Sequence, residues 1–261
     1  MDLVPLAYQI IRRVTGMRVK SRTLFRAEVE DKYGLEIGGP SGSFRDTGIL
    51  PLYRYAAGLD NCVFATETLW EGRRSEGQTF SYHPAKPNGC NFIREATELH
   101  GIANHKYDFI LSSHNLEHIA NPIRALKEWM RVVKAGGAII AVLPDYRDTF
   151  DHRRQPTTVR HMLEDYNSET KENDLTHLQE ILGLHDLSRD PNAGALDQFH
   201  QRSLRNFENR ALHHHVFDEC NSRVLFETVG LSVEIVELVK PHHIATLCRC
   251  PAPNALGLPS R

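Results

Sequence analysis

Residues 33–44 read YGLEIGGPSGSF, and this stretch determines how the remainder of the chain is interpreted. A short apolar run leads into Glu36 and is followed, between Gly38 and Ser43, by three glycines, a proline and two serines. So much backbone freedom after a buried strand fits either an ordinary turn or a loop that lets a charged ligand approach the main chain. The sequence on either side of the loop distinguishes these alternatives.

The composition is that of an ordinary globular protein. The 261 residues suffice for one sizeable α/β domain, and 41% of them are hydrophobic and 25% charged. Lys and Arg number 31 against 33 for Asp and Glu, which gives a net charge of −2. This balance provides no general attraction to nucleic acid or to an anionic membrane, and no apolar run is long enough to span a bilayer. We therefore expect neither a nucleic-acid partner nor a membrane span.

The cysteines and the N-terminal residues indicate the compartment. The five cysteines form no CxxC pair, and Cys248 and Cys250 are too close together in an extended segment to form a disulfide framework. The first residues lack the apolar core of a signal peptide. These features predict a cytoplasmic protein.

Residues 1–32 form a basic segment whose pattern predicts a helix. Basic side chains alternate with apolar ones such as Ile10 and Val14, but Gly16 interrupts the apolar stripe. We interpret the segment as a helix that packs over the domain and exposes its basic face. A helix that binds a membrane surface or a partner is the alternative.

The central part of the chain alternates strands with helices. Apolar runs predict strands over residues 34–39, 61–66, 107–113 and 138–144. A helix is expected over residues 48–58, and another opens at Asn121-Pro122 and stops at Gly136-Gly137. Residues 70–90 are rich in Gly, Pro and charge and are interpreted as a connecting loop. This order predicts a doubly wound sheet with right-handed crossovers.

The C-terminal part completes the sheet after an insertion. Residues 145–213 are polar and rich in His, with short helical stretches over 157–166 and 175–182. A helix ending at Gly230 and strands over 232–240 and 243–250 follow. We predict an α/β fold with a doubly wound, mostly parallel seven-stranded sheet, an antiparallel C-terminal strand and a His-rich insertion after the fifth strand. The insertion forms a lid on one domain, residues 33–250, and residues 251–261 form a tail.

The glycine loop alone does not identify its ligand. A nicotinamide dinucleotide, a phosphate and S-adenosylmethionine (SAM) are all compatible with such a loop. Glu36, however, lies in the strand two residues before Gly38, whereas a dinucleotide site has its acidic residue later, on the next strand. An acid directly ahead of the glycines suits a ligand that carries an ammonium or sulfonium cation.

The block from Tyr107 to Ile140 reads YDFILSSHNLEHIANPIRALKEWMRVVKAGGAII, and it resembles the class I SAM-dependent methyltransferases. Their pattern starts with an acidic residue before a small one, here in EATEL at 95–99, and continues through a YD strand, an LEH turn and a helix that ends RVVKAGG. The resemblance covers about residues 33–144. A looser resemblance is to the branch of this family that modifies glycans and natural products.

The resemblance implies that the loop binds the methionine end of SAM. Glu36 would accept hydrogen bonds around the methionine moiety, and the cofactor would lie on Gly38, Gly39 and Gly42. Pro40 stands where the usual pattern has its middle glycine.

The resemblance also implies contacts to the nucleoside. Glu95 would accept the adenine amino group, and the N–H of Ala96 would meet a ring nitrogen. For the ribose, an acid is expected at the tip of the second strand, where Asp60 lies early and Glu67 late. We favour Glu67, with Thr66 beside it.

Methyl transfer is an in-line displacement, so the enzyme must position the acceptor atom about 3 Å from the methyl and remove a proton if the acceptor is a hydroxyl. Ser112 and Ser113 end the strand that borders the reactive methyl. His114 follows at the carboxyl edge of the sheet, where open α/β folds bind ligands, and histidine titrates near neutrality. We expect His114 and His214 to be the candidate bases, with Asp145 at the same edge as the group that orients one of them.

The insertion supplies polar side chains for an acceptor. Arg153 and Arg154 would hold a phosphate or a carboxylate, and His177 and His185 would share one face of a continuous helix. A divalent ion on these imidazoles would acidify a diol, but His177 and His185 form no HxH or HxxxH pair with a matched carboxylate. We therefore assign no metal and interpret the histidines as helix caps or hydrogen-bonding groups.

Together these features predict a SAM-dependent methyltransferase that acts on an oxygen of a polar small molecule, such as a sugar, a nucleotide-linked sugar or a glycan intermediate. Two alternatives stay open because fold does not fix function. One is a module that binds SAM without transferring its methyl group, and the other is an isomerase or cyclase on the same fold.

Overall fold

The computed structural model describes residues 17–68 and 72–252. Residues 1–16 of the expected N-terminal helix and residues 253–261 of the expected tail lie outside the described residues. The described part of the N-terminal segment contains one short helix, α2 (Arg22–Ala27), which buries Phe25.

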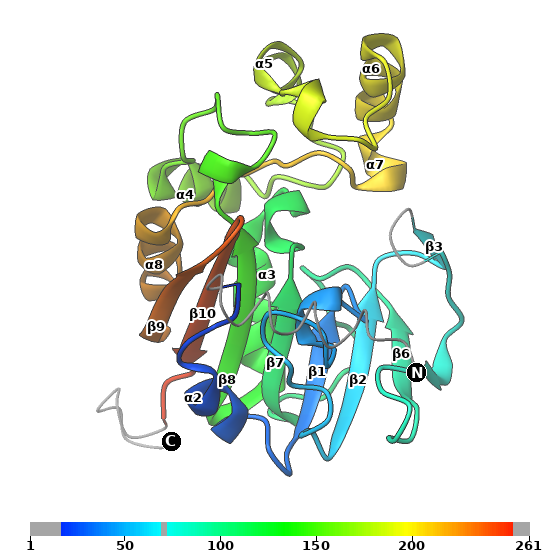
Figure 1. Cartoon of the computed structure of the whole chain (residues 1–261), viewed down its shortest axis with the longest axis vertical. Coiled ribbons are helices and arrows are strands. Elements are labelled where there is room, and N and C mark those ends of the chain that lie inside the picture. The colour runs from blue at the N-terminus through cyan, green and yellow to red at the C-terminus, as the bar shows by residue number, and fades with distance from the viewer. Residues whose placement is uncertain (1–16, 69–71, 253–261) are drawn as a thin grey trace.

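The main sheet of the described chain has eight strands (Figure 1). In spatial order they are β5 (Gly77–Phe80), β6 (Gly89–Ile93), β2 (Gly58–Val63), β1 (Tyr33–Ile37), β7 (Tyr107–Ser113), β8 (Val133–Pro144), β10 (His243–Arg249) and β9 (Ser232–Val239). The five strands from β6 to β8 are parallel, whereas β5, β10 and β9 are antiparallel to their neighbours. A separate two-stranded ribbon pairs β3 (Glu67–Thr68) with β4 (Gly72–Arg73). The predicted count of seven is therefore too low, because β5 adds an edge strand.

Helices cover the sheet and stand above its carboxyl end (Figure 1). Besides α2, they are α3 (Pro122–Val132), α4 (Val159–Asn167), α5 (Leu178–Leu184), α6 (Leu196–Leu204), α7 (Asn206–Asn209) and α8 (Glu219–Thr228). Single 3-10 turns are η1 (Gly42–Phe44), η2 (Leu116–His118), η3 (Tyr146–Asp148) and η4 (Leu187–Arg189).

The strands are buried on both faces, so their apolar side chains alternate between two cores. Ile110 and Ile139 belong to the core that α3, α4 and α8 cover. Phe109 and Ile140, one residue away on the same strands, belong to the other core, which α2 and residues 42–56 cover. Because both faces of the sheet are covered, a ligand can reach the strands at the edge formed by their ends.

Helix α3 begins where the sequence predicts. The Asn121 side-chain oxygen accepts a hydrogen bond from the N–H of Arg124 at 3.0 Å, and Pro122 occupies the first turn. Trp129 is fully buried. The helix ends at Val132, four residues before the predicted Gly136 stop, because β8 already starts at Val133.

The predicted helix over residues 48–58 is wrong. Pro51 interrupts that stretch, and a proline disfavours helical backbone at the residue before it. The N–H of Leu50 instead donates to the carbonyl of Ser43, and that of Leu52 to Phe44. This irregular segment covers one face of the sheet in place of a helix.

The interpretation of residues 70–90 as a plain loop is also wrong. Its described part contains β4, β5 and the start of β6. Strand β6 is hard to recognise because it carries a polar residue in its centre: the Asn91 side-chain oxygen accepts a hydrogen bond from the Asn61 amide at 2.8 Å, inside the sheet. Paired amides satisfy each other there, so the strand tolerates a side chain of low strand propensity.

Residues 145–217, here called the roof segment, connect β8 to α8 and lie above the carboxyl ends of the strands (Figure 1). Two of its helices, α4 and α5, occupy the stretches predicted as helical. The part around α5 and α6 has a small core of its own, formed by Leu178, Ile181, Ala193, Phe199 and Leu212.

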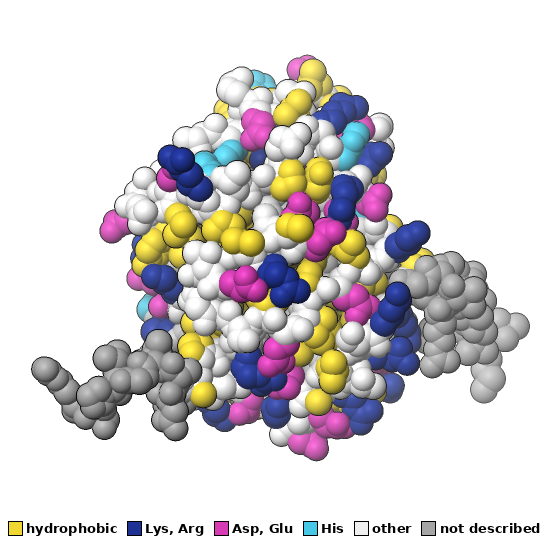
Figure 2. Space-filling view, turned by 90° about the vertical axis from the view of Figure 1, so that its left-hand side faces the viewer, with side chains coloured by type: hydrophobic (Ala, Val, Ile, Leu, Met, Phe, Trp, Pro, Cys, Tyr) yellow, Lys and Arg dark blue, Asp and Glu magenta, His cyan; other side chains and the backbone are white. Residues whose placement is uncertain are grey.

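The surface carries mixed charge. Figure 2 shows the side of α8 and β9, where basic and acidic side chains are interspersed with scattered apolar ones. Such a mixture is usual on globular domains. Within residues 17–68 and 72–252, no helix has the length and apolar character needed to cross a membrane.

Candidate active site

A cavity of about 440 Å³ lies at the carboxyl ends of β1, β2, β6, β7 and β8. Its wall combines the loops after these strands with side chains of the roof segment, among them Thr149, Phe150 and Asp190. Small-molecule sites measure about 300–1,000 Å³ and lie at this edge of open α/β sheets. The cavity is therefore the candidate active site.

The glycine loop forms one wall of the cavity. Gly38 has a φ of 77°, which favours glycine, and a Cβ there would lie 2.6 Å from the Asn115 amide nitrogen. The N–H of Gly39 donates to the Asn61 side-chain oxygen at 2.9 Å, and the Asn61 amide donates back to the Gly39 carbonyl at 3.2 Å. Gly38 and Gly42 line the cavity, while Gly39 is turned toward the sheet side of the loop.

Glu36 lies beneath the loop and does not line the cavity. Its side chain is fully buried, and both carboxylate oxygens lie 2.8 Å from the Tyr53 hydroxyl. The N–H and the hydroxyl of Ser41 also donate to it, at 3.1 and 3.0 Å. Glu36 therefore holds the glycine loop in shape.

Glu95 and Ala96 follow β6 and also line the cavity. The Glu95 carboxylate accepts a hydrogen bond from the Arg210 guanidinium at 2.7 Å. The indole N–H of Trp129 donates to the Ala96 carbonyl at 3.1 Å, which fastens this turn to α3. Both residues thus face the space in which the sequence predicts an adenine.

The tip of β2 presents an aromatic ring where an acid was expected. Phe64 lines the cavity there, and the Arg210 guanidinium lies 5.1 Å from its centre. Thr66 and Glu67 lie further along, outside the cavity wall, with Glu67 exposed in β3. Asp60 is buried within β2, where it accepts hydrogen bonds from two tyrosine hydroxyls at 2.6 and 2.8 Å. The structure does not bring Thr66, Glu67 or Asp60 to the cavity.

Strand β7 delivers His114 to the cavity. Ser112 is buried within the strand, whereas Ser113 lines the cavity and lies 2.8 Å from the Ser43 hydroxyl. His114 has a φ of 49°, and its N–H donates to the Val142 carbonyl at 2.8 Å. Positive φ is strained for a residue other than glycine and is often found at functional sites.

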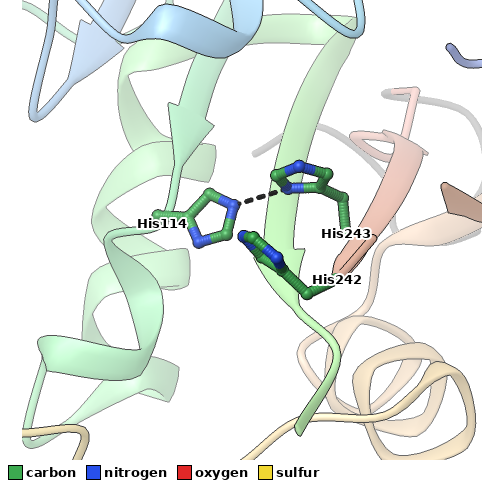
Figure 3. A group of neighbouring side chains, drawn as sticks. All are labelled: His114, His242 and His243. Carbon is green, nitrogen blue, oxygen red and sulfur yellow. Dashed lines mark hydrogen bonds between the residues drawn. The ribbon is translucent and has the colours of Figure 1, made fainter. Parts of the chain in front are cut away.

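His114 belongs to a group of three histidines (Figure 3). Its Nε2 lies 2.8 Å from Nδ1 of His243 at the start of β10, and the ring of His242 packs edge-on against it at 5.6 Å between centroids. Burial, and after it the neighbouring imidazoles, hold the pKa of His114 well below its usual range. His114 is therefore neutral at pH 7 and has a lone pair that can accept a proton.

Glu117 places a buried carboxyl group beside these imidazoles. Its Oε1 lies 3.7 Å from Nδ1 of His114 and 3.9 Å from Nε2 of His118, and neither oxygen has a hydrogen-bond partner among the described residues. Burial raises the pKa of Glu117 to about 7. A cavity-lining group that titrates near neutrality is suited to proton transfer.

His213 carries positive charge next to this group. Burial alone would lower its pKa, but Asp151, whose Oδ2 lies 2.5 Å from the His213 Nδ1, outweighs burial and raises it. Burial opposes the ionised form of Asp151 too, yet His213 and then Arg154 lower the pKa of Asp151 to about 2. His213 and Asp151 therefore form a buried ion pair at the cavity wall.

Arg154 supports this ion pair and does not line the cavity, so the expectation that it binds an acceptor is corrected. The side chain is buried, and Nη1 donates to Asp151 at 3.1 Å and to the His213 carbonyl at 2.9 Å. Nη2 donates to the His214 carbonyl at 3.4 Å. Arg154 thus fixes the backbone that carries His213.

Three further predicted residues lie outside the cavity wall. His214 is buried beside the Asn206 amide at 3.0 Å, and burial lowers its pKa to about 4. Asp145 accepts hydrogen bonds from the Arg147 guanidinium at 2.8 Å. The exposed Arg153 reaches Asp186, 3.3 Å away.

His177 and His185 do not share a helix face. They flank α5 at its two ends, because the helix spans only Leu178–Leu184. His177 faces His161, while His185 lies 3.2 Å from Asp190. Neither lines the cavity.

Sequence reasoning missed several residues of the wall. They are Phe64, Glu117, His213, His242, Asp190, Arg202 and Arg210. The HHH run at residues 213–215 predicts that one of the three imidazoles lines the cavity. It does not predict which one, because neighbouring side chains on an extended segment point to opposite sides. Glu117 gave no signal beyond its place in the LEH turn, because burial and not the residue type makes it unusual.

Comparison with known proteins adds a family match. Residues 71–141 match the model of a family described as a methyltransferase domain. The matched span includes β6, the turn with Glu95 and Ala96, β7, η2 and α3. No curated protein matches the chain.

Several solved structures are similar in outline. A SAM-dependent methyltransferase from Methanosarcina mazei has 13% identity and a TM-score of 0.49, covering 88% of this chain and 97% of that one. An S-adenosylmethionine-dependent methyltransferase from Mesorhizobium loti has 12% identity and a TM-score of 0.46, covering 88% and 95%. A SAM-dependent methyltransferase from Aquifex aeolicus has 11% identity and a TM-score of 0.42, covering 95% and 98%.

The family match supports a methyl-transferring enzyme. The sheet has the arrangement that the resemblance implies, mostly parallel with antiparallel C-terminal strands.

Proposed function

We propose that this protein transfers the methyl group of SAM to a hydroxyl oxygen of a polar small molecule, such as a sugar, a nucleotide-linked sugar or a glycan intermediate. The observation that carries the proposal is the division of the cavity wall. The glycine loop and Glu95 form one side, and His114, Glu117 and His213 form the other. The second side suits removal of a hydroxyl proton.

The first side has the residues to hold SAM, which supplies an electrophilic methyl group on a sulfonium. Gly38 and Gly42 let a ligand approach the main chain, and a Cβ on Gly42 would meet nothing within 4 Å. Glu95 offers a carboxylate, and Phe64 offers an aromatic face where the ribose and base would lie. Glu36 acts indirectly by holding the loop.

His114 is the base in this proposal. With SAM bound, its methyl group would pass to the acceptor oxygen and leave S-adenosylhomocysteine, and the neutral imidazole of His114 would accept the hydroxyl proton. His243 at 2.8 Å fixes the orientation of the His114 ring. The N–H of Asp145 donates to the His242 carbonyl at 2.9 Å, so the segment around Asp145 positions the neighbouring loop.

The roof segment supplies the acceptor side with polar groups. Asp190, Asn192 and Arg202 line the cavity, and the Arg202 guanidinium donates to Asp190 at 3.1 Å. Carboxylate, amide and guanidinium groups pair with hydroxyls or with an anionic substituent better than with a lipid chain. We propose that residues 145–213 form the lid of the acceptor pocket.

Replacing His114 by alanine tests the base. We expect kcat to fall by about 10²–10⁴ because proton removal is lost, while the Kd for SAM changes little. Binding is measured by titration calorimetry, and turnover by S-adenosylhomocysteine release with an acceptor from a sugar and glycan library. The exposed His200→Ala variant is the control. Equal losses of SAM affinity and kcat would remove His114 from this role, and turnover without S-adenosylhomocysteine would favour an isomerase or cyclase.

The low pKa of His114 predicts the acidic limb of the pH–rate profile. The base must be unprotonated, and the unprotonated fraction falls only as pH drops through the pKa. Because burial holds the pKa of His114 well below 6.5, we expect kcat to be insensitive to His114 protonation above pH 6.5. The profile of kcat between pH 4.5 and 8 measures this. An acidic limb centred above about pH 7 would contradict it.

A further inference from the structure

A second group of ligand-type side chains lies in the roof segment, apart from the cavity wall. His161 and Asp165 come from α4, one turn apart on the same face. His177 precedes α5, and His215 lies in the extended segment before α8. Three elements distant in sequence therefore bring these four side chains together.

The donor atoms lie at separations typical of metal ligands. Nε2 of His161 is 2.9 Å from Nε2 of His177 and 3.3 Å from Oδ2 of Asp165. Nε2 of His215 is 3.8 Å from the same Asp165 oxygen. Ligands bound at about 2.0–2.1 Å to one tetrahedral ion lie roughly 3.3 Å from one another. The ligand atoms of His161, Asp165 and His215 all lie within 4.8 Å of one another, and His177 adjoins them through His161.

Two buried polar atoms of the group lack partners. Asp165 is 8% exposed, and its Oδ2 has no hydrogen-bond partner among the described residues, while Oδ1 accepts from the Thr170 hydroxyl. His215 is 1% exposed, and its Nδ1 has none either, although its Nε2 lies 3.3 Å from the Ala120 carbonyl. A buried carboxylate oxygen without a partner is destabilising, and a cation beside it removes that penalty.

A carboxylate outside the group orients one of the imidazoles. Oε2 of Glu180 lies 3.5 Å from Nδ1 of His177, which leaves Nε2 directed at His161. Metal-binding histidines commonly have their second nitrogen held by a carboxylate or a carbonyl in this way.

We infer that His161, Asp165 and His215 bind one divalent metal ion, with zinc(II) as the best match to the donors and with His177, 2.9 Å from His161, beside them. Imidazole nitrogens together with a carboxylate oxygen suit zinc. None of these side chains lines the cavity, so the ion has a structural role.

The ion stabilises the part of the molecule with the smallest apolar core. The core around α5 and α6 has five buried residues, and a metal ion compensates for limited apolar burial in small units. The site also fastens His215, two residues after the cavity-lining His213. Metal binding therefore helps to hold the ion pair of His213 and Asp151 in place.

The two other groups of ligand-type side chains adjoin the cavity. One comprises His114, His242 and His243, of which His114 and His243 lie at hydrogen-bond distance. The other comprises Glu117, His118 and His213. Both belong to the candidate active site, and a test of the roof site must distinguish them from it.

The full-length chain, stripped with a chelator and reloaded with zinc(II) or cobalt(II), tests the inference. We expect about one equivalent of metal per chain by mass spectrometry of the metal, and an intense visible absorption for tetrahedral cobalt(II). Removing the metal should lower the Tm by roughly 5 °C or more, because an ion that binds only the folded chain stabilises it. The His161→Ala/Asp165→Asn double variant should bind metal at least about 100-fold more weakly.

Matched variants separate the three groups. His114→Gln and Glu117→Gln each change one cavity group, and His200→Ala changes an exposed histidine of α6; all three should retain the metal. Wild-type protein that binds less than about 0.1 equivalent overturns the inference, and this holds whether or not the double variant folds. Loss of the metal in Glu117→Gln or His114→Gln, with retention in the double variant, overturns it as well.

Discussion

At the scale of single residues, the glycine loop shows how an acid can serve a binding site without touching the ligand. Glu36 accepts hydrogen bonds from Ser41 and Tyr53 and is fully buried. Its oxygens lie under Gly39, so close that only a residue without a Cβ fits above them. The acid and the glycine are therefore a matched pair, and the shape of the loop depends on both.

Gly39→Ala tests this pairing. The new Cβ would lie 2.2 Å from Oε2 of Glu36, which cannot move without losing its hydrogen bonds. We expect a loss of about 1–3 kcal/mol in the free energy of unfolding and at least tenfold weaker SAM binding. Urea denaturation and calorimetry measure the two effects. Gly42→Ala, where a Cβ meets nothing within 4 Å, is the control for stability and should unfold like the wild type; equal stability of both variants and the wild type would contradict the pairing.

At the scale of elements, α3 connects the core to the cavity. The fully buried Trp129 packs among the apolar residues of one sheet face. Its indole N–H also donates to the Ala96 carbonyl on the cavity wall. The helix thus sets the position of the turn that carries Glu95.

Trp129→Phe separates these two roles. It keeps an aromatic ring in the core but removes the hydrogen bond, and we expect a loss of about 1–2 kcal/mol in stability together with weaker SAM binding. Ile123→Val, in the same helix and core, should lower stability by about 0.5–1.5 kcal/mol and leave SAM binding unchanged. The Kd for SAM of each variant is measured by calorimetry. Equal Kd values for the two variants would show that the hydrogen bond between Trp129 and Ala96 does not affect SAM binding.

Elements with strong local signals could be predicted from the sequence, and those set by distant contacts could not. The strand YDFILSS and the Asn-Pro start of α3 have the expected bounds because an apolar run and a helix cap are local features. Strand β6 was missed because Asn91 is satisfied by Asn61 from another strand. The same division holds for the candidate site. The position of His114 at the cavity follows from its strand, whereas the fold of the roof segment determines that His213 and not His214 lines the cavity.

At the scale of the whole molecule, the sheet and the roof segment differ in how they are held together. The sheet lies between two large apolar cores, whereas the region around α5 and α6 has a small one and several buried charges. Asp190 is one of these charges, 3.2 Å from His185 and 3.1 Å from Arg202. We therefore expect the roof segment to open more readily than the sheet.

Asp190→Asn tests this difference. Burial opposes the ionised form, but His185 and then Arg202 outweigh it and lower the pKa of Asp190 to about 2 from 3.8. A lowered carboxyl pKa contributes stability above the ordinary pKa, and this contribution disappears as pH falls from about 4 to 2. At pH 7 we expect the variant to lose up to about 2 kcal/mol of roof stability, read as faster hydrogen exchange in residues 178–212. Unchanged exchange there, or equal acceleration in the sheet, would be the contrary result.

The pairing of β10 with β8 has a consequence for how the protein is made. The loop after β1 is synthesised early and His242 and His243 are synthesised late. All of them border or adjoin the same cavity. A growing chain therefore completes the His114 side of the cavity wall last, after the glycine loop, Phe64 and Glu95 have been synthesised. That side is complete only once the C-terminal strand pair has been added to the sheet.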